Sequence, residues 1–271
     1  MRGPEALFAS EDHWVTSMGA WFPQRGAILR GKAVFEDFQE LSWMGLLLYA
    51  ITGRVFDENQ MRLFEGMWKL CANYPDPRIW NNRVAALAGT ARSTATLGIS
   101  AATAISESTI YGFRAVIRCI DMLYRFQQQL EQGMDLTTLV QQELEIHQGI
   151  FGYGRPIKQK DERIAPMLAL AQELGYAGGA HIRLAFAIED VLLSKRWRWR
   201  LHINIAALLA ALAADQGLSC REYYRFMIPC FAGGMFPCHI DAIDQTEGTL
   251  FPLRCTRIVY NGAARRRWHT P

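Results

Sequence analysis

Three segments combine residue types and spacings that could bind an anionic ligand or support catalysis. The first, Ser106–Arg114 (SESTIYGFR), is a polar cluster between two apolar stretches of helical periodicity. The second, Phe151–Arg163 (FGYGRPIKQKDER), is a glycine turn followed by four basic residues. Glycines permit a tight backbone path of the kind found where a ligand lies against the main chain. The third, Ser194–Ala207 (SKRWRWRLHINIAA), leads from a basic and aromatic run into an apolar one.

Each segment also has a purely structural interpretation, and the sequence leaves both interpretations open. Ser106 and Thr109 could cap helices, as serine and threonine often do. The run Lys158–Arg163 could begin a solvated helix. The run Lys195–Arg200 could form a surface on which tryptophan rings pack under arginine stems. No single segment decides the function.

The sequence offers little for metal or nucleophilic chemistry. Its six histidines show no HExxH or HxH spacing, and only Cys238 and His239 place two soft ligands together. A serine nucleophile elbow and a phosphate-binding GxxxxGK[ST] loop are both absent from the sequence. We therefore expect no metal. His147, His202 and His239 could each be a structural residue or a catalytic base.

Helical periodicity dominates the chain, so we predict an all-α fold. Alternating β patterns are scarce: only Arg257–Tyr260 (RIVY) indicates a short strand, and the region from about Gly133 to Asp161 is expected to be irregular. Ile203–Ala214 is apolar all round and must be buried. The other expected helices are Phe35–Leu48, ending at Gly53; Met61–Cys71, capped by Asp57; the small-residue stretch Arg83–Ser106; Phe113–Gln129, ending near Gly133; and Pro166–Leu174, closed by Gly175.

Length, composition and charge restrict the class of protein. The 271 residues are enough for a sizeable core, and we expect one domain, residues 1–271, with about 134–200 as a possible smaller subdomain. A net charge of +3 argues against nucleic acid as the main partner. The sequence has no run of about 18 uncharged apolar residues, no signal peptide and no CxxC pair. We therefore expect no membrane partner, a cytoplasmic location and buried free thiols.

The order of several short motifs resembles the citrate synthase superfamily, most closely its shorter citryl-CoA lyase-like branch, along nearly the whole chain. That branch opens with a W-x-T, an R-G and a helix ending in LL-x-x-G. A G-F-G-H-P…K…D-P-R box, an N-V-D box and a closing Y-x-G follow. The stretches that resemble these motifs are, in order, Trp14–Thr16, Ile28–Gly31, Leu47–Gly53, Ile150–Arg163, Leu201–Ala207 and Val259–Gly262.

The resemblance implies an all-α, citrate synthase-like helical bundle of reduced size that forms a homodimer through the small-residue stretch Arg83–Ser106. It also implies a small carboxylate or acyl-CoA ligand, with a coenzyme A thioester as co-substrate and no tightly bound cofactor. Family members run a Claisen-type reaction with two histidines and one aspartate. Here those positions fall on Tyr111, Arg155 and Ala206, so all three catalytic side chains are replaced.

Positions that bind ligand in the family are retained better than the catalytic ones. A bidentate guanidinium suits a carboxylate better than a lysine does, and arginines occupy the matching positions here. The substrate-binding positions that the resemblance carries over are Arg163, Arg254, Arg257, Asn204, Gly152 and Gly154, and those for the CoA phosphates are Lys158, Lys160, Lys195 and Arg196.

Two functions are compatible with these residues. In the first, the protein is an enzyme with a non-standard site that forms or breaks a carbon–carbon bond, or performs a related decarboxylation or cyclisation, but is not a true citrate synthase. Tyr111 would donate to a developing oxyanion, and Arg155 would polarise a carbonyl or hold a second carboxylate. In the second, it is a catalytically inactive relative that binds a ligand or a partner. The missing base of the enzyme would come from His202, His147, His239 or Asp241, or would be unnecessary, as in a decarboxylation or cyclisation. Of the four residues we select His202.

Overall fold

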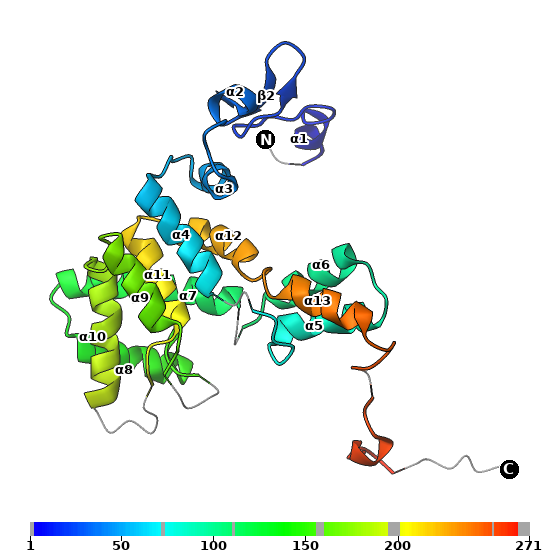
Figure 1. The fold of residues 1–271 in the computed structure, drawn as a ribbon. Coiled ribbons are helices and arrows are strands. Elements are labelled where there is room, and N and C mark those ends of the chain that lie inside the picture. Colours follow the sequence, from blue (N-terminus) through cyan, green and yellow to red (C-terminus); the bar gives the residue numbers. More distant parts are fainter. Residues whose placement is uncertain are drawn as a thin grey trace. The chain divides into compact units, whose positions relative to one another are not determined.

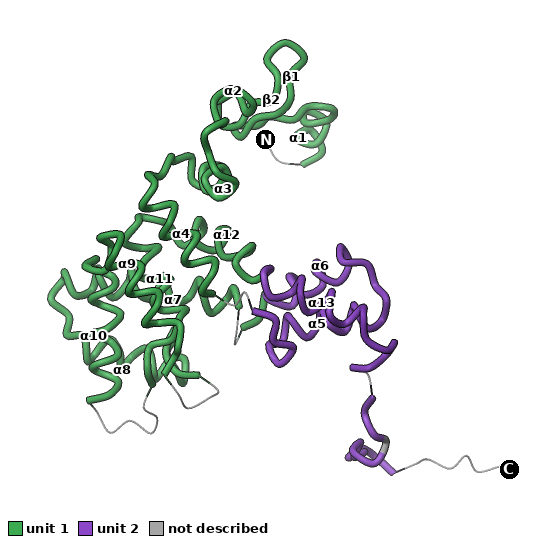
Figure 2. Tube along the Cα trace, in the orientation of Figure 1, with its two compact units in different colours: residues 1–73, 107–231 green, residues 74–106, 232–271 purple. Residues whose placement is uncertain are grey.

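The computed structural model describes residues 3–71, 74–109, 112–155, 160–194, 201–250 and 252–264. The chain divides into two compact units (Figure 2). Unit 1 comprises residues Met1–Asn73 and Glu107–Phe231, and unit 2 comprises Tyr74–Ser106 and Ala232–Pro271. Both units are built mainly from helices (Figure 1), which confirms the all-α prediction. The expected smaller subdomain, residues 134–200, lies within unit 1, and the single-domain organisation stays a prediction.

The N-terminal part of unit 1 contains a small sheet that the sequence analysis missed. Its strands are antiparallel in the order β1-β2-β3, with Trp21 opposite Ala27 and Ile28 opposite Ala33. Strands this short show too few alternating residues for a period of two to be read from sequence. The elements of this part are α1 (Pro4–Phe8), β1 (Trp21–Phe22), β2 (Gly26–Leu29), β3 (Lys32–Ala33) and α2 (Val34–Asp37).

Helix α11 (Ile205–Asp215) forms the buried centre of unit 1. Every residue from Ala207 to Ala214 is buried, as the apolar run in the sequence required. It packs against α7 (Phe113–Glu131) and α10 (Ala180–Ser194). The other helices of unit 1 are α3 (Trp43–Thr52), α4 (Glu58–Leu70), α8 (Leu136–His147), α9 (Ile164–Glu173) and α12 (Cys220–Cys230).

Local signals place several of these helix ends correctly. Gly53 ends α3 with φ +74°, and Asp57 begins α4 through a capping box with Gln60.

Two expectations about the helices of unit 1 were wrong. The region from Gly133 to Asp161 is not irregular throughout, because Asp135 caps α8 and the helix buries an apolar side. The expected helix Phe35–Leu48 is divided into α2 and α3, because Ser42 caps a new helix.

Unit 2 is a smaller helical unit. The expected small-residue helix Arg83–Ser106 is two helices, because Thr94 caps the second one. Small residues allow close packing here: a Cβ on Gly89 would lie 2.5 Å from the carbonyl oxygen of His239. The elements of unit 2 are α5 (Trp80–Thr90), α6 (Ala95–Ile105), α13 (Met235–Asp244) and the 3₁₀ helix η1 (Cys255–Arg257).

The expectation of a strand at Arg257–Tyr260 was wrong. Arg257 ends η1, and Ile258, Val259 and Tyr260 are exposed without regular structure. A strand requires a neighbour for its backbone hydrogen bonds, and within the described residues this segment pairs with none.

By length and composition, one stretch, Cys220–Asp244, could cross a membrane. Half of its most apolar window is buried, as in the core helix of a soluble protein, so this is weak evidence for a membrane span. In the structure the stretch is divided between α12 and α13.

Candidate active site

Two segments that lie far apart in the sequence pair side by side in unit 1. The glycine loop Phe151–Arg155 forms an isolated antiparallel bridge with Leu201–Ile205, between Tyr153 and Ile203. The N–H of Gly154 donates to the carbonyl of His202 at 2.7 Å, and the N–H of Asn204 donates to the carbonyl of Gly152 at 2.9 Å. The second and third segments singled out in the sequence therefore meet.

Glycine is required at two positions of this loop. Gly152 and Gly154 have φ values of +86° and +82°, which L-residues with side chains rarely adopt. A Cβ on Gly152 would lie 2.6 Å from Cβ of Ala207 and 2.7 Å from Sγ of Cys119, and one on Gly154 would lie 2.8 Å from Cδ2 of Leu201. The tight backbone path expected from the sequence is present, and it packs against protein atoms.

Asn204 and Tyr153 fix the paired segments onto the helices. Oδ1 of Asn204 accepts the N–H of Ala206 and so caps α11, while its Nδ2 donates to the carbonyl of Gly154 at 2.8 Å. The buried Tyr153 hydroxyl donates to the carbonyl of Ala185 on α10 at 2.7 Å, and burial raises its pKa well above the ordinary value. Both ends of the Asn204 amide are therefore used within the protein.

A buried carboxylate, Asp161, links the basic segment to the start of α11. Nε of Arg163 donates to Oδ1 of Asp161 at 2.9 Å, and Nη2 donates to Oδ2 at 2.8 Å. The N–H of Ile205 donates to Oδ2 at 2.9 Å. Arg163 also donates to the carbonyl of Cys71. The predicted carboxylate-binding arginine thus holds an internal carboxylate in this structure.

Opposing effects act on the pKa of the Asp161 carboxyl. Burial acts to raise the pKa, but the hydrogen bonds and charge of Arg163 and the N–H of Ile205 outweigh burial and lower it. Asp161 is therefore a carboxylate at neutral pH. Sequence reasoning did not select it; the signal available was an acidic residue two positions before Arg163.

Arg155, which the sequence resemblance aligned with a histidine, has acidic partners. Its guanidinium bonds with the carboxylate of Glu162, with Nη2 donating to Oε1 at 3.3 Å, and lies 3.9 Å from Oδ1 of Asp161. The hydrogen bond that Arg155 donates to Glu162 is the main cause that raises the pKa of Arg155. The side chain of Glu162 is 66% exposed and that of Arg155 only 17% exposed. Arg155 is thus a fixed, mostly buried cation whose main partner faces solvent.

His202 lies beside the glycine loop and is held by a carboxylate. Its Nδ1 is 3.0 Å from Oε1 of Glu189 on α10, and the same oxygen accepts the N–H of Ile203 at 3.0 Å. Because a carboxylate accepts hydrogen bonds, Nδ1 is the donor in this contact. Nε2 has no hydrogen-bond partner among the residues that the structure describes. Sequence reasoning selected His202 but gave no sign of Glu189.

The remaining candidates are distributed as follows. Lys160 is exposed, and its carbonyl accepts from Arg155 at 3.4 Å. The other base candidates differ in their surroundings: Nε2 of His147 is 3.6 Å from Glu143 in unit 1, and the buried His239 bonds with the carbonyl of Ser93 in unit 2. Tyr111, Lys158, Lys195 and Arg196 lie outside the described residues, and Arg254 and Arg257 are exposed in unit 2.

Among the described residues, no group of three or more His, Cys, Asp or Glu side chains could hold a metal ion. The geometry offers instead a cationic guanidinium, a buried arginine–carboxylate pair and an oriented imidazole within two paired segments of one unit. This combination can bind an anion and move a proton.

Solved structures of enzymes that handle citrate match this chain. Citryl-CoA lyase from Hydrogenobacter thermophilus matches with a TM-score of 0.79 and 19% identity, over 94% of this chain and 97% of that chain. A mutant ATP citrate lyase from Methanosaeta concilii, in complex with (3S)-citryl-CoA, matches with a TM-score of 0.74 and 15% identity, over 97% of this chain and 45% of that chain. Citrate synthase from Thermotoga maritima matches with a TM-score of 0.65 and 17% identity, over 84% and 60% of the two chains. The chain has the citrate synthase-like fold.

This fold confirms the resemblance inferred from the order of the sequence motifs, and it confirms the all-α bundle. At the level of sequence, no protein-family model and no curated protein matches the chain. The citrate synthase-like fold is therefore shared at low sequence identity. The chain spans less than half of the ATP citrate lyase chain, whose further parts have no counterpart in this comparison.

Proposed function

We propose that this protein is a diverged citrate synthase-like or citryl-CoA lyase-like enzyme that acts on a small carboxylate or acyl thioester. Its reaction forms or breaks a carbon–carbon bond, or is a related decarboxylation or cyclisation. The observation that carries the proposal is the imidazole of His202, oriented by Glu189 and adjacent in the fold to the glycine loop that presents Arg155. A neutral imidazole with an available Nε2 is the usual general base in enzymes.

In this proposal each group has a defined role. His202 takes the proton that the lost aspartate would have taken, Arg155 binds or polarises the carboxylate or carbonyl, and Tyr111 donates to the developing oxyanion. Coenzyme A thioester is the co-substrate rather than a tightly bound cofactor. Its phosphates would meet the basic residues Lys158, Lys160, Lys195 and Arg196.

The ion pairs of the structure suggest which arginine meets the substrate. Arg163 is held by a buried carboxylate, whereas Arg155 bonds with the exposed Glu162. Because the side chain of Glu162 is 66% exposed, it can move into water when a substrate carboxylate takes its place at Arg155. We therefore assign the first substrate contact to Arg155 and a supporting, positioning role to Arg163. The matched ATP citrate lyase structure, which contains (3S)-citryl-CoA, makes a carboxylated thioester the first ligand to test.

A catalytically inactive, ligand-binding relative is the second candidate. It is favoured by Ala206, which stands at the position of the proton-abstracting aspartate and whose methyl group cannot take a proton. Under either function, citrate synthesis from acetyl-CoA and oxaloacetate should be undetectable, because all three side chains that the resemblance assigns to that reaction are replaced. The two candidates differ in one result: the enzyme converts a carboxylated CoA thioester into products that chromatography separates from it, and the inactive relative binds it unchanged.

Assembly and location belong to the same proposal. We propose a homodimer that uses the apolar helices of unit 2, and a cytoplasmic protein that has no nucleic acid or membrane partner.

The test of the site compares Arg155→Ala with Arg62→Ala. Arg62 forms a more exposed pair with Glu173, at 2.6 Å, and is a control for the loss of a paired arginine outside the candidate site. In calorimetric titrations with citryl-CoA, Arg155→Ala should bind at least about tenfold more weakly, because charge-assisted hydrogen bonds contribute about 1.5–3 kcal/mol each. The melting temperature without ligand should change little in either variant. Equal affinity of Arg155→Ala and the unchanged protein would contradict the proposal.

A further inference from the structure

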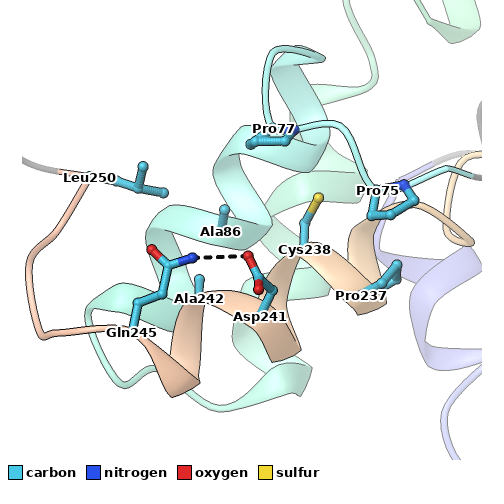
Figure 3. Close-up of a pocket in the computed structure, with 9 residues that line it drawn as sticks. All are labelled: Pro75, Pro77, Ala86, Pro237, Cys238, Asp241, Ala242, Gln245 and Leu250. Carbon is cyan, nitrogen blue, oxygen red and sulfur yellow. Dashed lines mark hydrogen bonds between the residues drawn. The ribbon is translucent and has the colours of Figure 1, made fainter.

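Unit 2 contains a pocket whose lining shares no residue with the paired segments of the candidate active site (Figure 3). Its volume is about 390 Å³, within the range of small-molecule sites. Three prolines, Pro75, Pro77 and Pro237, form much of its apolar lining. The polar side chains of the lining are Asp241 and Gln245, one turn apart on and just after α13.

Hydrogen bonds fix the walls of this pocket. Nδ2 of the buried Asn82 donates to the carbonyls of Tyr74 at 3.0 Å and Asp76 at 3.2 Å, and so holds the proline-containing loop against α5. On the other side, Arg92 donates to the carbonyl of Gln245 at 2.8 Å and holds the end of α13. Arg92 also pairs with Glu247 at 3.5 Å and is not one of the lining residues.

The polar groups of the pocket are mainly acceptors. Nε2 of Gln245 donates to Oδ2 of Asp241 at 2.9 Å, as the dashed line in Figure 3 shows. Because a carboxylate only accepts, the amide nitrogen must face Asp241, and the Gln245 oxygen is left available as an acceptor. The third polar lining group, the thiol of Cys238, stays neutral because burial raises its pKa. No lysine, arginine or histidine is among the described lining residues.

We infer that this pocket binds a small organic ammonium ion with an apolar body. The apolar part would pack on the three prolines and Leu250, and the ammonium group would donate to Asp241 and to the Gln245 oxygen. Anions are disfavoured, because they would meet the carboxylate with no cation to compensate it. This inference is independent of the proposed active site, which lies in unit 1 and selects a carboxylate.

The test uses three ligands of the same size on the full chain: cyclohexylammonium, cyclohexanol and cyclohexanecarboxylate. Binding is followed by calorimetry and by protection of Cys238 from alkylation, read by peptide mass spectrometry. Cyclohexylammonium should bind about fivefold tighter than cyclohexanol, a modest factor because Asp241 is exposed. The carboxylate should not protect Cys238.

Substitutions test whether Asp241 causes the preference for the ammonium ion over the alcohol. Asp241→Asn keeps the shape of the side chain and should remove the preference for the ammonium ion over the alcohol. Asp244→Asn, a neighbouring exposed acid outside the pocket, should retain it. If Asp241→Asn does not fold, Gln245→Met removes the second acceptor and should weaken ammonium binding about two- to fivefold. The inference is overturned if the carboxylate binds equally, if the preference survives Asp241→Asn, or if no ligand protects Cys238 up to about 10 mM.

Discussion

Glu189 holds His202 in one orientation: Oε1 of the glutamate lies 3.0 Å from Nδ1 of the imidazole. The same oxygen accepts the N–H of Ile203 at 3.0 Å, so the carboxylate is itself fixed to the backbone that carries the histidine. This arrangement makes Nδ1 the donor to Glu189 and turns Nε2 away from that carboxylate. The relationship therefore fixes the orientation of His202, the residue to which the proposed function gives the role of base.

The first prediction concerns this pair and rests on the proposed enzyme. His202→Ala should lower kcat for cleavage of citryl-CoA by about 100-fold or more, because a positioned general base contributes about 100- to 10,000-fold. Added imidazole should restore part of the rate in that variant. Glu189→Gln should lower kcat with little change in KM, because the imidazole would lose its orientation while the ligand site remains. A rate in His202→Ala equal to that of the unchanged enzyme would remove His202 from the mechanism.

The second prediction concerns the buried carboxylate of Asp161. Asp161→Asn should lower the free energy of unfolding at neutral pH by about 3 kcal/mol, because it leaves Arg163 without its charged partner. The folded pKa of Asp161 is lowered, so its contribution is present above the unfolded pKa of about 3.9 and is lost as pH falls through the folded pKa. The measurement is urea unfolding at neutral pH and at about pH 3. The free energies of unfolding of Asp161→Asn and of the unchanged protein should be closer to each other at the lower pH.

A control for this prediction is Asp244→Asn, which removes an exposed acid and should change the free energy of unfolding by less than about 0.5 kcal/mol. A difference between Asp161→Asn and the unchanged protein that stays constant down to acid pH would show that the charge of Asp161 is not responsible.

The third prediction compares two glycines of the same loop region. Gly152→Ala should destabilise the protein by about 2 kcal/mol or more, because φ is +86° and the new Cβ would lie 2.6 Å from Cβ of Ala207. Gly149→Ala should be nearly neutral, since a Cβ there would meet nothing within 4 Å. The measurement is the denaturant concentration at the midpoint of unfolding of each variant. The midpoints can be compared directly when the free energy of unfolding depends on denaturant equally in both variants. Similar midpoints would mean that the loop rearranges to accept a side chain.

The fourth prediction concerns assembly. On unit 2, Leu97 of α6 is 65% exposed and Ile240 of α13 is 61% exposed, so these apolar helices are not covered within the chain. Leu97→Glu and Ile240→Glu should each shift a dimer toward monomer in sedimentation equilibrium, because a charge would be buried at the interface. Val55→Glu, at a residue of unit 1 that is 69% exposed, should leave the assembly unchanged. A stable monomer of the unchanged protein at micromolar concentration would contradict the homodimer.

The sequence by itself determined the helical class and many local boundaries. Asp57 and Gly53 mark the start of α4 and the end of α3, because capping depends on residues within a few positions of each other. The burial of α11 followed from a run without a polar face. The same reasoning missed α8 and the three short strands, and it proposed a strand at Arg257–Tyr260 that is absent. In these segments the local pattern is too short or too mixed to select one period.

Only the tertiary structure decided which residues meet. Glu189 reaches His202 across 13 positions of sequence, and Asp161 reaches the N–H of Ile205 across 44. The sequence marked Arg163 and Asn204 as ligand-binding residues, but their side chains are used by Asp161 and by Gly154 and Ala206. Hydrophobic periodicity and capping act within one element, whereas the partner of a buried polar group depends on how separate elements pack together.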